Sequence, residues 1–312
     1  MRMQRNGRIA AFALAAVIAG ACVAYLVTRF EWSAAFRLVR AADIVTLAGA
    51  ALCVHFAYIC VRTLRWQVVM RDLHPDVSFG SLYWITAVVV SLAILTPGQI
   101  GETVKVELLK RRGFGGRLAG LGSFALERVL DILTVAAFGL IGLAFGSGLS
   151  ERYPALAWLA VLLLCAGLAA LYVLGRRASP GTEAGWFALL RSGTGTGPIK
   201  AKMLALTVAS WGLIGLGWQI SLHMVGFDAS FPAVCWLVSL VTFGTLISLI
   251  PGGVGIAEVL TIEAMITMGA TPATAQAGAI ILRVYALIGI VFGLCHLLIW
   301  PLLRNASRGS EA

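Results

Sequence analysis

Long apolar runs dominate the chain, and several have the length of about 20 residues that an α-helix needs to cross a bilayer. They cover about residues 9–28, 44–61, 118–145, 154–174, 203–225 and 273–301. Hydrophobic residues make up 60% of the 312 residues and charged residues 12%, with a mean hydropathy of +0.92. An ordinary soluble domain carries about 25% charged residues. The composition excludes a soluble enzyme, a nucleic-acid-binding module and a disordered regulator, and it predicts an all-α polytopic membrane protein.

Two further apolar runs stop at Pro-Gly breaks. The run 80–96 ends at Pro97-Gly98, and the run 231–250 ends at Pro251-Gly252-Gly253. A shorter segment with acidic residues follows each break, over 101–112 and 255–268. Non-helical backbone at membrane depth is tolerated only where protein or a water-filled cavity satisfies its polar groups. The pattern therefore predicts two helical hairpins, 80–112 and 231–268, with a Pro-Gly break at each tip.

The distribution of Lys and Arg orients these elements, because cytoplasmic loops are enriched in positive charge. Basic residues collect at the start of the chain and in the segments 62–71, 105–117, 175–202 and 304–308. The segments 147–154, 226–231 and 269–273 carry almost none. All the basic segments lie on one side only if the first hairpin opens to the cytoplasm and the second opens to the outside. The loop 29–42, which holds three arginines, is the one misfit.

We therefore expect six spanning helices plus two opposed re-entrant helical hairpins. Both termini are expected in the cytoplasm, the segment 62–71 is expected to be a short basic loop, and 175–202 is expected to be a cytoplasmic linker. The whole chain, 1–312, is expected to form a single integral membrane domain.

The two breaks also resemble each other. LTPGQIGE begins at Leu95 and LIPGGVG at Leu249, which places Pro97 and Pro251 154 residues apart. Arg128 and Arg283 follow at an offset of 155. This spacing predicts inverted internal repeats over about 9–146 and 155–303, an arrangement used by many secondary transporters. The alternative is two chance Pro-Gly breaks in an apolar protein.

Charged residues inside apolar helices are costly, so each one needs a partner or a function. No acidic residue lies in the span of Arg283, which leaves two interpretations: a pair with Glu258 or Glu263, or an anionic ligand such as a phosphate. Arg128 has Asp131 three residues on, so neutralisation within its own helix competes with a binding role.

The glycines at the tips either permit a sharp turn or let a ligand reach bare backbone N–H groups at a helix N-terminus. We predict substrate contacts at Arg128, Arg283, Pro97, Gly98, Gly101, Pro251, Gly252, Gly253 and Gly255. We predict coupling or gating roles for Glu102, Glu127, Asp131, Glu258 and Glu263. Carboxylates at membrane depth outnumber the Arg and Lys expected there, which would permit coupling to protons.

No pattern in the sequence predicts a metal site, a cofactor or an enzymatic activity. The histidines and cysteines lack metal-ligand spacing. The Gly-rich stretch Gly193–Gly197 follows no strand, so it does not predict a nucleotide loop.

Three stretches resemble a known family: TPGQIGETVKVELLKRRG from Thr96, ALERVLDI from Ala125, and IPGGVGIAEVL from Ile250 with the Arg283 helix behind it. They resemble the transmembrane, flippase-like domain of bifunctional lysylphosphatidylglycerol synthases and of stand-alone bacterial and archaeal proteins, over about residues 10–300. The resemblance implies movement of a charged lipid between leaflets, and some relatives are associated with polyprenyl-linked sugars or hopanoids. The bifunctional members add a soluble aminoacyl-transferase domain, which this sequence lacks, so aminoacyl transfer is not expected.

The resulting expectation is a lipid flippase or transporter of the bacterial inner membrane. Its partner would be a membrane lipid of the phospholipid or polyprenyl-phosphate type, with a second copy of the chain or lipid-synthesis enzymes as further partners and no nucleic acid. The alternative is a membrane-embedded transferase or an assembly factor in lipid-linked glycan or hopanoid synthesis.

Overall fold

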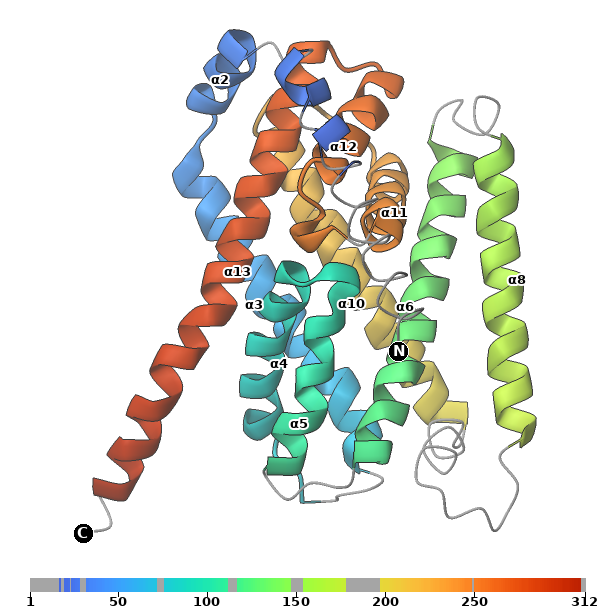
Figure 1. Cartoon of the computed structure of the whole chain (residues 1–312), viewed down its shortest axis with the longest axis vertical. Helices are drawn as coiled ribbons and strands as arrows, with labels where there is room; N and C mark the ends of the chain where they lie inside the picture. Colours follow the sequence, from blue (N-terminus) through green and yellow to red (C-terminus); the bar gives the residue numbers. More distant parts are fainter. Residues whose placement is uncertain are drawn as a thin grey trace, which may run out of the picture.

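The computed structural model describes residues 17, 20–22, 24–28, 32–71, 76–111, 117–146, 154–177, 197–248 and 250–309. Every regular element in these ranges is a helix (Figure 1), so the predicted all-α class is confirmed. Most of the first predicted span, 9–28, lies outside the described residues. The elements are α2 (Trp32–Ala41), α3 (Ile44–Arg71), α4 (Phe79–Leu95), η1 (Pro97–Thr103), α5 (Val104–Arg111), α6 (Arg117–Phe145), α8 (Pro154–Arg177), α10 (Gly197–His223), α11 (Phe231–Ser248), η2 (Pro251–Gly253), α12 (Ile256–Thr267) and α13 (Pro272–Gly309).

Five of the described helices contain a segment long and apolar enough to cross a bilayer. These segments are Ile44–Arg71, Glu127–Phe145, Ala201–His223, Phe231–Ser248 and Pro272–Ile299. Phe79–Leu95 and Pro154–Ala169 are shorter apolar segments. A helix satisfies its own backbone hydrogen bonds, which makes it one of the few structures that can span lipid. The helices have the character expected of a multi-pass membrane protein.

Local sequence explains where several helices begin and end. Asp43 precedes α3 and accepts a hydrogen bond of 3.0 Å from the backbone N–H of Thr46. The Thr46 hydroxyl also donates to this carboxylate, and these bonds hold the pKa of Asp43 below its usual value. Ser78 caps α4 through the N–H of Ser81 at 3.2 Å. The same helix ends at Leu95, because Thr96 is extended and the residue before a proline disfavours the helical region.

Two predicted loops are helical in the structure. Helix α3 continues to Arg71, so the segment 62–71 is not a short basic loop. Trp66 and Met70 in this last part of α3 are buried, which explains why the helix persists through its charged residues. Within the predicted loop 29–42, residues Trp32–Ala41 form α2.

The two Pro-Gly segments form the tips of two helix–turn–helix hairpins. One consists of α4, η1 and α5, and the other consists of α11, η2 and α12. Figure 1 shows the first hairpin in the lower half of the molecule and the second in the upper half. The 3-10 turns η1 and η2, which form the two tips, contact each other. The tips therefore face one another near the middle of the molecule.

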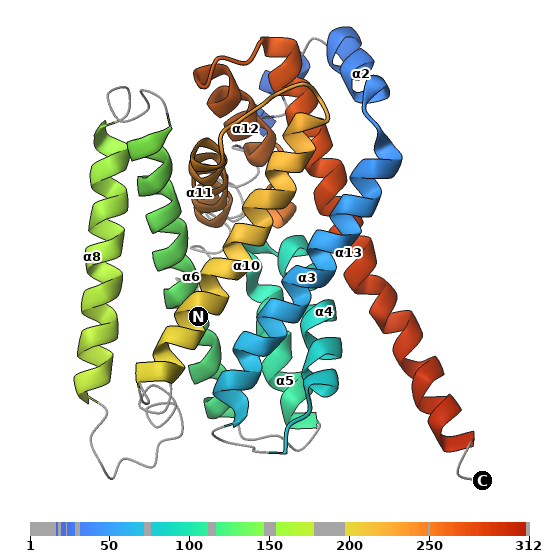
Figure 2. The same ribbon diagram turned by 180° about the vertical axis from the view of Figure 1, so that it is seen from behind.

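Helix packing is reciprocal between the two halves of the chain. Helix α6, which follows the first hairpin, packs on α11, the first arm of the second hairpin. Helix α13, which follows the second hairpin, packs on α4, the first arm of the first hairpin. Helices α3 and α10 pack on each other, and Figure 2 shows them running side by side. Each hairpin is thus held by a long helix from the opposite half.

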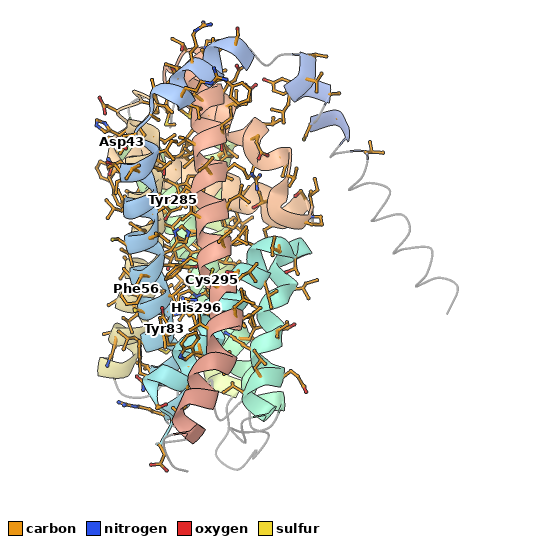
Figure 3. All side chains as sticks on the ribbon, turned by 90° about the vertical axis from the view of Figure 1, so that its left-hand side faces the viewer. Asp43, Phe56, Tyr83, Tyr285, Cys295 and His296 are labelled. Carbon is orange, nitrogen blue, oxygen red and sulfur yellow. The ribbon has the colours of Figure 1, made fainter. Side chains whose placement is uncertain are left out.

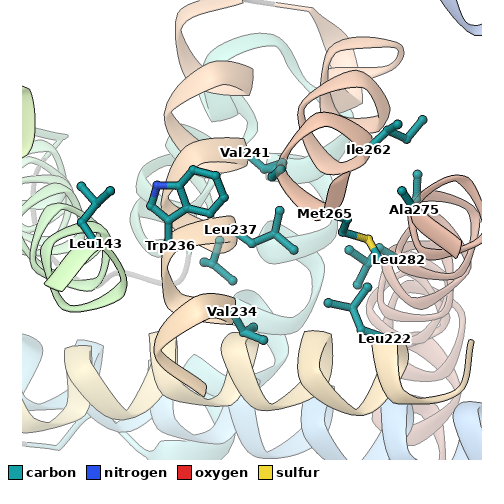
Figure 4. Close-up of a cluster of buried hydrophobic side chains, with 13 residues drawn as sticks. Leu143, Leu222, Val234, Trp236, Leu237, Val241, Ile262, Met265, Ala275 and Leu282 are labelled. Carbon is teal, nitrogen blue, oxygen red and sulfur yellow. The ribbon is translucent and has the colours of Figure 1, made fainter. Parts of the chain in front are cut away.

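The largest buried apolar cluster lies around the second hairpin (Figure 4). It brings together Trp236 and Leu237 of α11, Met265 of α12, Leu282 of α13 and Leu222 of α10. Lipid tails are as apolar as these side chains, so close packing rather than the hydrophobic effect favours such contacts inside a bilayer. This cluster fixes the second hairpin against its supporting helices.

Aromatic side chains line the junction of α13 with α3 and α4 (Figure 3). The rings of His55 and Tyr285 lie 4.5 Å apart at their centroids. Farther along α13, His296 lies 3.2 Å from the hydroxyl of Tyr83 through its Nε2. Its Nδ1 lies 2.9 Å from the carbonyl oxygen of Phe292. These contacts hold α13 beside the elements that form the site described next.

Candidate functional site

Side chains satisfy the non-helical backbone at both tips. In the first tip, the hydroxyl of Thr96 accepts a 2.7 Å hydrogen bond from the N–H of Gly101. In the second tip, Glu258 accepts a 2.7 Å bond from the N–H of Gly255. The carbonyl of Gly252 accepts a 2.8 Å bond from Arg283. Polar groups of the non-helical backbone at both tips are therefore bound by protein side chains.

A network of buried ion pairs lies beside the first tip. It joins side chains of α3, η1, α5 and α6, and its members are Arg62, Arg65, Glu102, Lys105, Glu127, Arg128 and Asp131.

Arg65 is the centre of the network's inner part and is completely buried. Its guanidinium lies 2.6 Å from Asp131 and 3.1 Å from Glu127. Lys105 donates to the second oxygen of Glu127 at 2.9 Å. The indole N–H of Trp211 donates to Asp131 at 3.1 Å. Such multiple bonding is what makes buried charges tolerable, because an unpaired one would cost several kcal/mol.

Arg62 and Arg128 form the outer part of the network. Arg62 lies 2.9 Å from Glu102, and Arg128 lies 2.9 Å from the other oxygen of the same carboxylate. Arg128 also lies 2.6 Å from Asp131, so the predicted pairing within α6 is confirmed. The side chain of Arg62 is 10% exposed and that of Arg128 is 23% exposed. These two cations are the members of the network with most access to a ligand.

The charge balance differs from the one predicted. The network contains four cations, Arg62, Arg65, Lys105 and Arg128, against three carboxylates, Glu102, Glu127 and Asp131. The expectation of excess carboxylates is wrong for this cluster, because Arg62 and Arg65 belong to α3 rather than to a loop and Lys105 pairs with Glu127. The described network carries an excess of one positive charge.

Beside the second tip, Arg283 is paired with Glu258. The Nε of Arg283 donates to Glu258 at 2.6 Å, and its Nη2 forms an ion pair with the same oxygen. The two side chains are 26% and 18% exposed. The second predicted partner, Glu263, instead accepts a hydrogen bond from Tyr25. Of the two partners that the sequence left open, the structure selects Glu258.

Two adjoining cavities connect these charged groups. The first has a volume of about 220 Å³, with Arg62, Glu102 and Arg128 in its wall. The second has a volume of about 140 Å³, with Glu258 and Arg283 in its wall. Both cavities share the wall residues Ile94, Trp218, Val241, Leu282 and Ala286. The two cavities thus share an apolar stretch of wall, and each has charged side chains elsewhere in its lining.

Of the predicted tip residues, the structure places Gly252 and Gly253 in cavity walls. Gly252 lines the second cavity, and Gly252 and Gly253 line a third cavity of about 120 Å³ at the tips. Pro251 begins η2, and Gly255 caps α12 as predicted. Gly101 lies inside the 3-10 turn, so the helix after the first tip begins at Val104.

The backbone of Pro97 and Gly98 belongs to η1. The exposure and contacts of these two residues are outside what the structure describes. Their predicted substrate contacts therefore remain predictions.

Arg62, Arg65 and Lys105 are the functional candidates that the sequence reasoning missed. Arg62 and Arg65 are three residues apart in RTLRWQVVM, where they stand among mainly apolar residues, a pattern compatible with a continuing helix. Lys105 follows Glu102 by three residues in the same way. Among the described residues, no group of three His, Cys, Asp or Glu side chains could hold a metal ion.

Comparison with known proteins identifies the family. The sequence model of the lysylphosphatidylglycerol synthase TM region matches residues 11–293. The chain is also similar to glycosyltransferase AglD of Haloferax volcanii, with 28% identity over 114 residues. That alignment covers 36% of this chain and 18% of the relative, so the chain spans about a fifth of the length of the curated relative it matches. The chain belongs to the family of the lysylphosphatidylglycerol synthase TM region.

Proposed function

We propose that the protein is a lipid flippase that moves an anionic phospholipid or a polyprenyl-phosphate-linked lipid between leaflets. It acts by translocation, without covalent catalysis, in the bacterial inner membrane. The single observation that carries this proposal is the pair of adjoining cavities, each with charged side chains in its lining. A headgroup phosphate crossing a bilayer needs such groups in place of water, while its acyl chains remain in lipid.

The hairpin geometry supports a path through the molecule. We propose that both hairpins are re-entrant and open to opposite sides, with six helices spanning around them. In each half, the arginine of the following helix pairs with a glutamate just after the tip: Arg128 with Glu102, and Arg283 with Glu258. The reciprocal packing of α6 on α11 and α13 on α4 supports an inverted repeat. In transporters with inverted repeats, the substrate site lies at the interface of the two repeats, where these two ion pairs are found.

The proposed path uses the arginines in sequence. The phosphate first meets Arg62 and Arg128 in the first cavity and then passes to Arg283 in the second. Guanidinium groups suit this role, because their planar fork donates two parallel hydrogen bonds to a phosphate. At the second position, the phosphate replaces Glu258, whose carboxylate holds Arg283 in the structure.

A translocation assay on purified protein tests the function. Proteoliposomes receive tail-labelled phosphatidylglycerol, a labelled polyprenyl phosphate or phosphatidylcholine, and a membrane-impermeant reductant bleaches the label in the outer leaflet. Transport makes the inner-leaflet label accessible. We expect accessibility to rise for the anionic lipids and to stay low in protein-free liposomes. Full protection of the inner-leaflet pool for every lipid would refute the flippase.

The orientation is tested separately. Single cysteines at 110–117 and 269–273, in a Cys-free variant, are labelled with an impermeant maleimide on intact cells. The proposed topology places both termini and 110–117 in the cytoplasm, so only the cysteine at 269–273 should react. Equal reaction at both sites would refute the opposed hairpins.

The similarity to part of a glycosyltransferase favours a second candidate, a membrane partner in lipid-linked glycan synthesis. Such a protein would bind the lipid carrier without moving it, either as a transferase component or as an assembly factor. Binding of a polyprenyl phosphate with no translocation in the same proteoliposomes would support this candidate over the flippase.

A further inference from the structure

The charged part of the first cavity has an excess of positive charge. Arg62 and Arg128 face this cavity, and the only carboxylate among its described wall residues is Glu102. Both arginines already hold Glu102. A cationic ligand would therefore find no carboxylate available for pairing, whereas an anion would meet two guanidinium groups.

Aromatic side chains form much of the remaining wall. They belong to α3, α10 and α13, and they are Tyr58, Trp211, Trp218, Tyr285 and His55. Such rings can accept the C–H face of a polyol or a sugar, and they can also attract a cation. The wall alone therefore fits two kinds of headgroup.

The charge of the wall decides between these two, because a ligand cation would meet two guanidinium groups and one carboxylate that already pairs with both. Arg62 also covers one of the rings. Its guanidinium carbon lies 5.7 Å from the centre of the Tyr58 ring, and it donates to the Tyr58 hydroxyl at 3.0 Å. The protein's own cation thus occupies an aromatic face that a ligand cation would use. The indole N–H of Trp211 is bound to Asp131, so this ring offers the cavity mainly its apolar surface. A neutral hydroxylated group fits what remains.

The charged side chains that line the second cavity have no net charge, so this cavity does not favour one sign of headgroup charge. Arg283 and Glu258 are one cation and one carboxylate in direct contact. The charge preference is therefore determined at the first cavity, where the described network contains four cations and three carboxylates.

We propose that the first cavity selects lipids whose headgroup carries one net negative charge and a neutral hydroxyl-bearing remainder, and that it rejects cationic headgroups. The phosphodiester binds Arg62 and Arg128, and the hydroxylated part lies against the aromatic wall. This inference rests on the proposed function, and it narrows the substrate class to anionic polyol or sugar phosphodiesters.

Competition binding on the full chain in detergent tests the selection, with native mass spectrometry as the readout. The probes share the same acyl chains: phosphatidylglycerol, its lysyl ester, phosphatidylmethanol and phosphatidylcholine. We expect phosphatidylglycerol to bind at least about tenfold more tightly than its cationic lysyl ester. It should also bind more tightly than phosphatidylmethanol, which has the same charge without hydroxyl groups. Equal or tighter binding of the lysyl ester would overturn the proposal.

Two variants locate the selection in this cavity. Arg62→Gln removes the excess charge, and Thr245→Asp adds a negative charge to the cavity wall without touching the network. Each should reduce the preference over the lysyl ester to less than about threefold. The matched control, Arg37→Gln, removes a positive charge from the exposed surface of α2 and should leave the preference unchanged. If neither cavity variant changes the preference, the site lies elsewhere.

The binding and transport results are independent. The preference of the unaltered protein decides the selectivity even if a variant fails to fold. Translocation of the lysyl ester alone would overturn the selectivity and leave the flippase intact. Selective binding with no translocation of any probe would overturn the flippase and leave the selectivity of the first cavity intact.

Discussion

The two halves of the molecule carry the same ion pair in different surroundings. In the first half, Arg128 shares Glu102 with Arg62 and belongs to a buried network that joins four elements. In the second half, Arg283 contacts Glu258 and the carbonyl of Gly252, with both charged side chains about a fifth to a quarter exposed. A network of this kind is rigid because each charge has several partners. The two arginines are similarly exposed, but the Glu258 side chain is 18% exposed against 2% for Glu102. Another anion can replace the more exposed carboxylate, so we propose that the moving step lies in the second half.

Breaking the first network should have the largest effect on stability. Arg65→Met removes a fully buried guanidinium and leaves Glu127 and Asp131 each without one partner. Removing one partner of a buried ion pair costs about 3–5 kcal/mol. We expect a corresponding loss of unfolding free energy, measured by thermal or denaturant unfolding in detergent. Arg40→Met, at an exposed position on α2, is the matched control and should change little. Equal stability of the two variants would show that the network is not structural.

The glycines of the two tips provide a second comparison. A Cβ at position 101 would lie 2.4 Å from the carbonyl oxygen of Leu92, which is backbone and cannot easily move. At Gly252 the space is open to 3.7 Å, but φ is +64°, a region that costs a residue with a side chain about 1–2 kcal/mol. We expect Gly101→Ala to destabilise the protein by about 2–3 kcal/mol and Gly252→Ala by less. The same unfolding measurement checks the order.

Gly212 supplies the control for both. It lies inside α10 with no atom near its added Cβ, so Gly212→Ala should be neutral or slightly stabilising. A reversed order at the tips would mean that the first tip can relax more than its packing suggests.

Hydropathy and Pro-Gly breaks were sufficient to predict the helical class and the positions of the two breaks between helices. Two pairings that the sequence offered as alternatives are present in the structure, Arg128 with Asp131 and Arg283 with Glu258. The central network was missed because its partners come from α3, η1, α5 and α6, far apart in the chain. Treating Arg62 and Arg65 as loop residues followed from a rule in which charge ends a span. The rule fails here because carboxylates of α6 neutralise the arginines of α3 and allow them to be buried. The sequence of α3 alone does not reveal these partners.

The smallest stability effect, together with a complete loss of transport, is expected for Arg283. Arg283→Ala removes a partly exposed pair, which is worth about 1 kcal/mol. The same change removes the proposed phosphate ligand in the second cavity, so translocation should stop while binding in the first cavity persists. Arg283→Lys should recover transport only in part, because an ammonium cannot donate the two parallel bonds of a guanidinium. Unfolding and translocation are measured on the same preparations.

The double variant Arg283→Ala with Glu258→Gln separates structure from function. Removing both charges should restore the small stability loss, since no carboxylate remains without its partner. Transport should stay absent, because the anion position has lost its guanidinium. If the double variant transports at the normal rate, the pair is only structural, and the path must run through the first half alone. If Arg283→Ala instead unfolds as readily as Arg65→Met, the second pair is as structural as the first network, and the assigned difference between the halves is wrong.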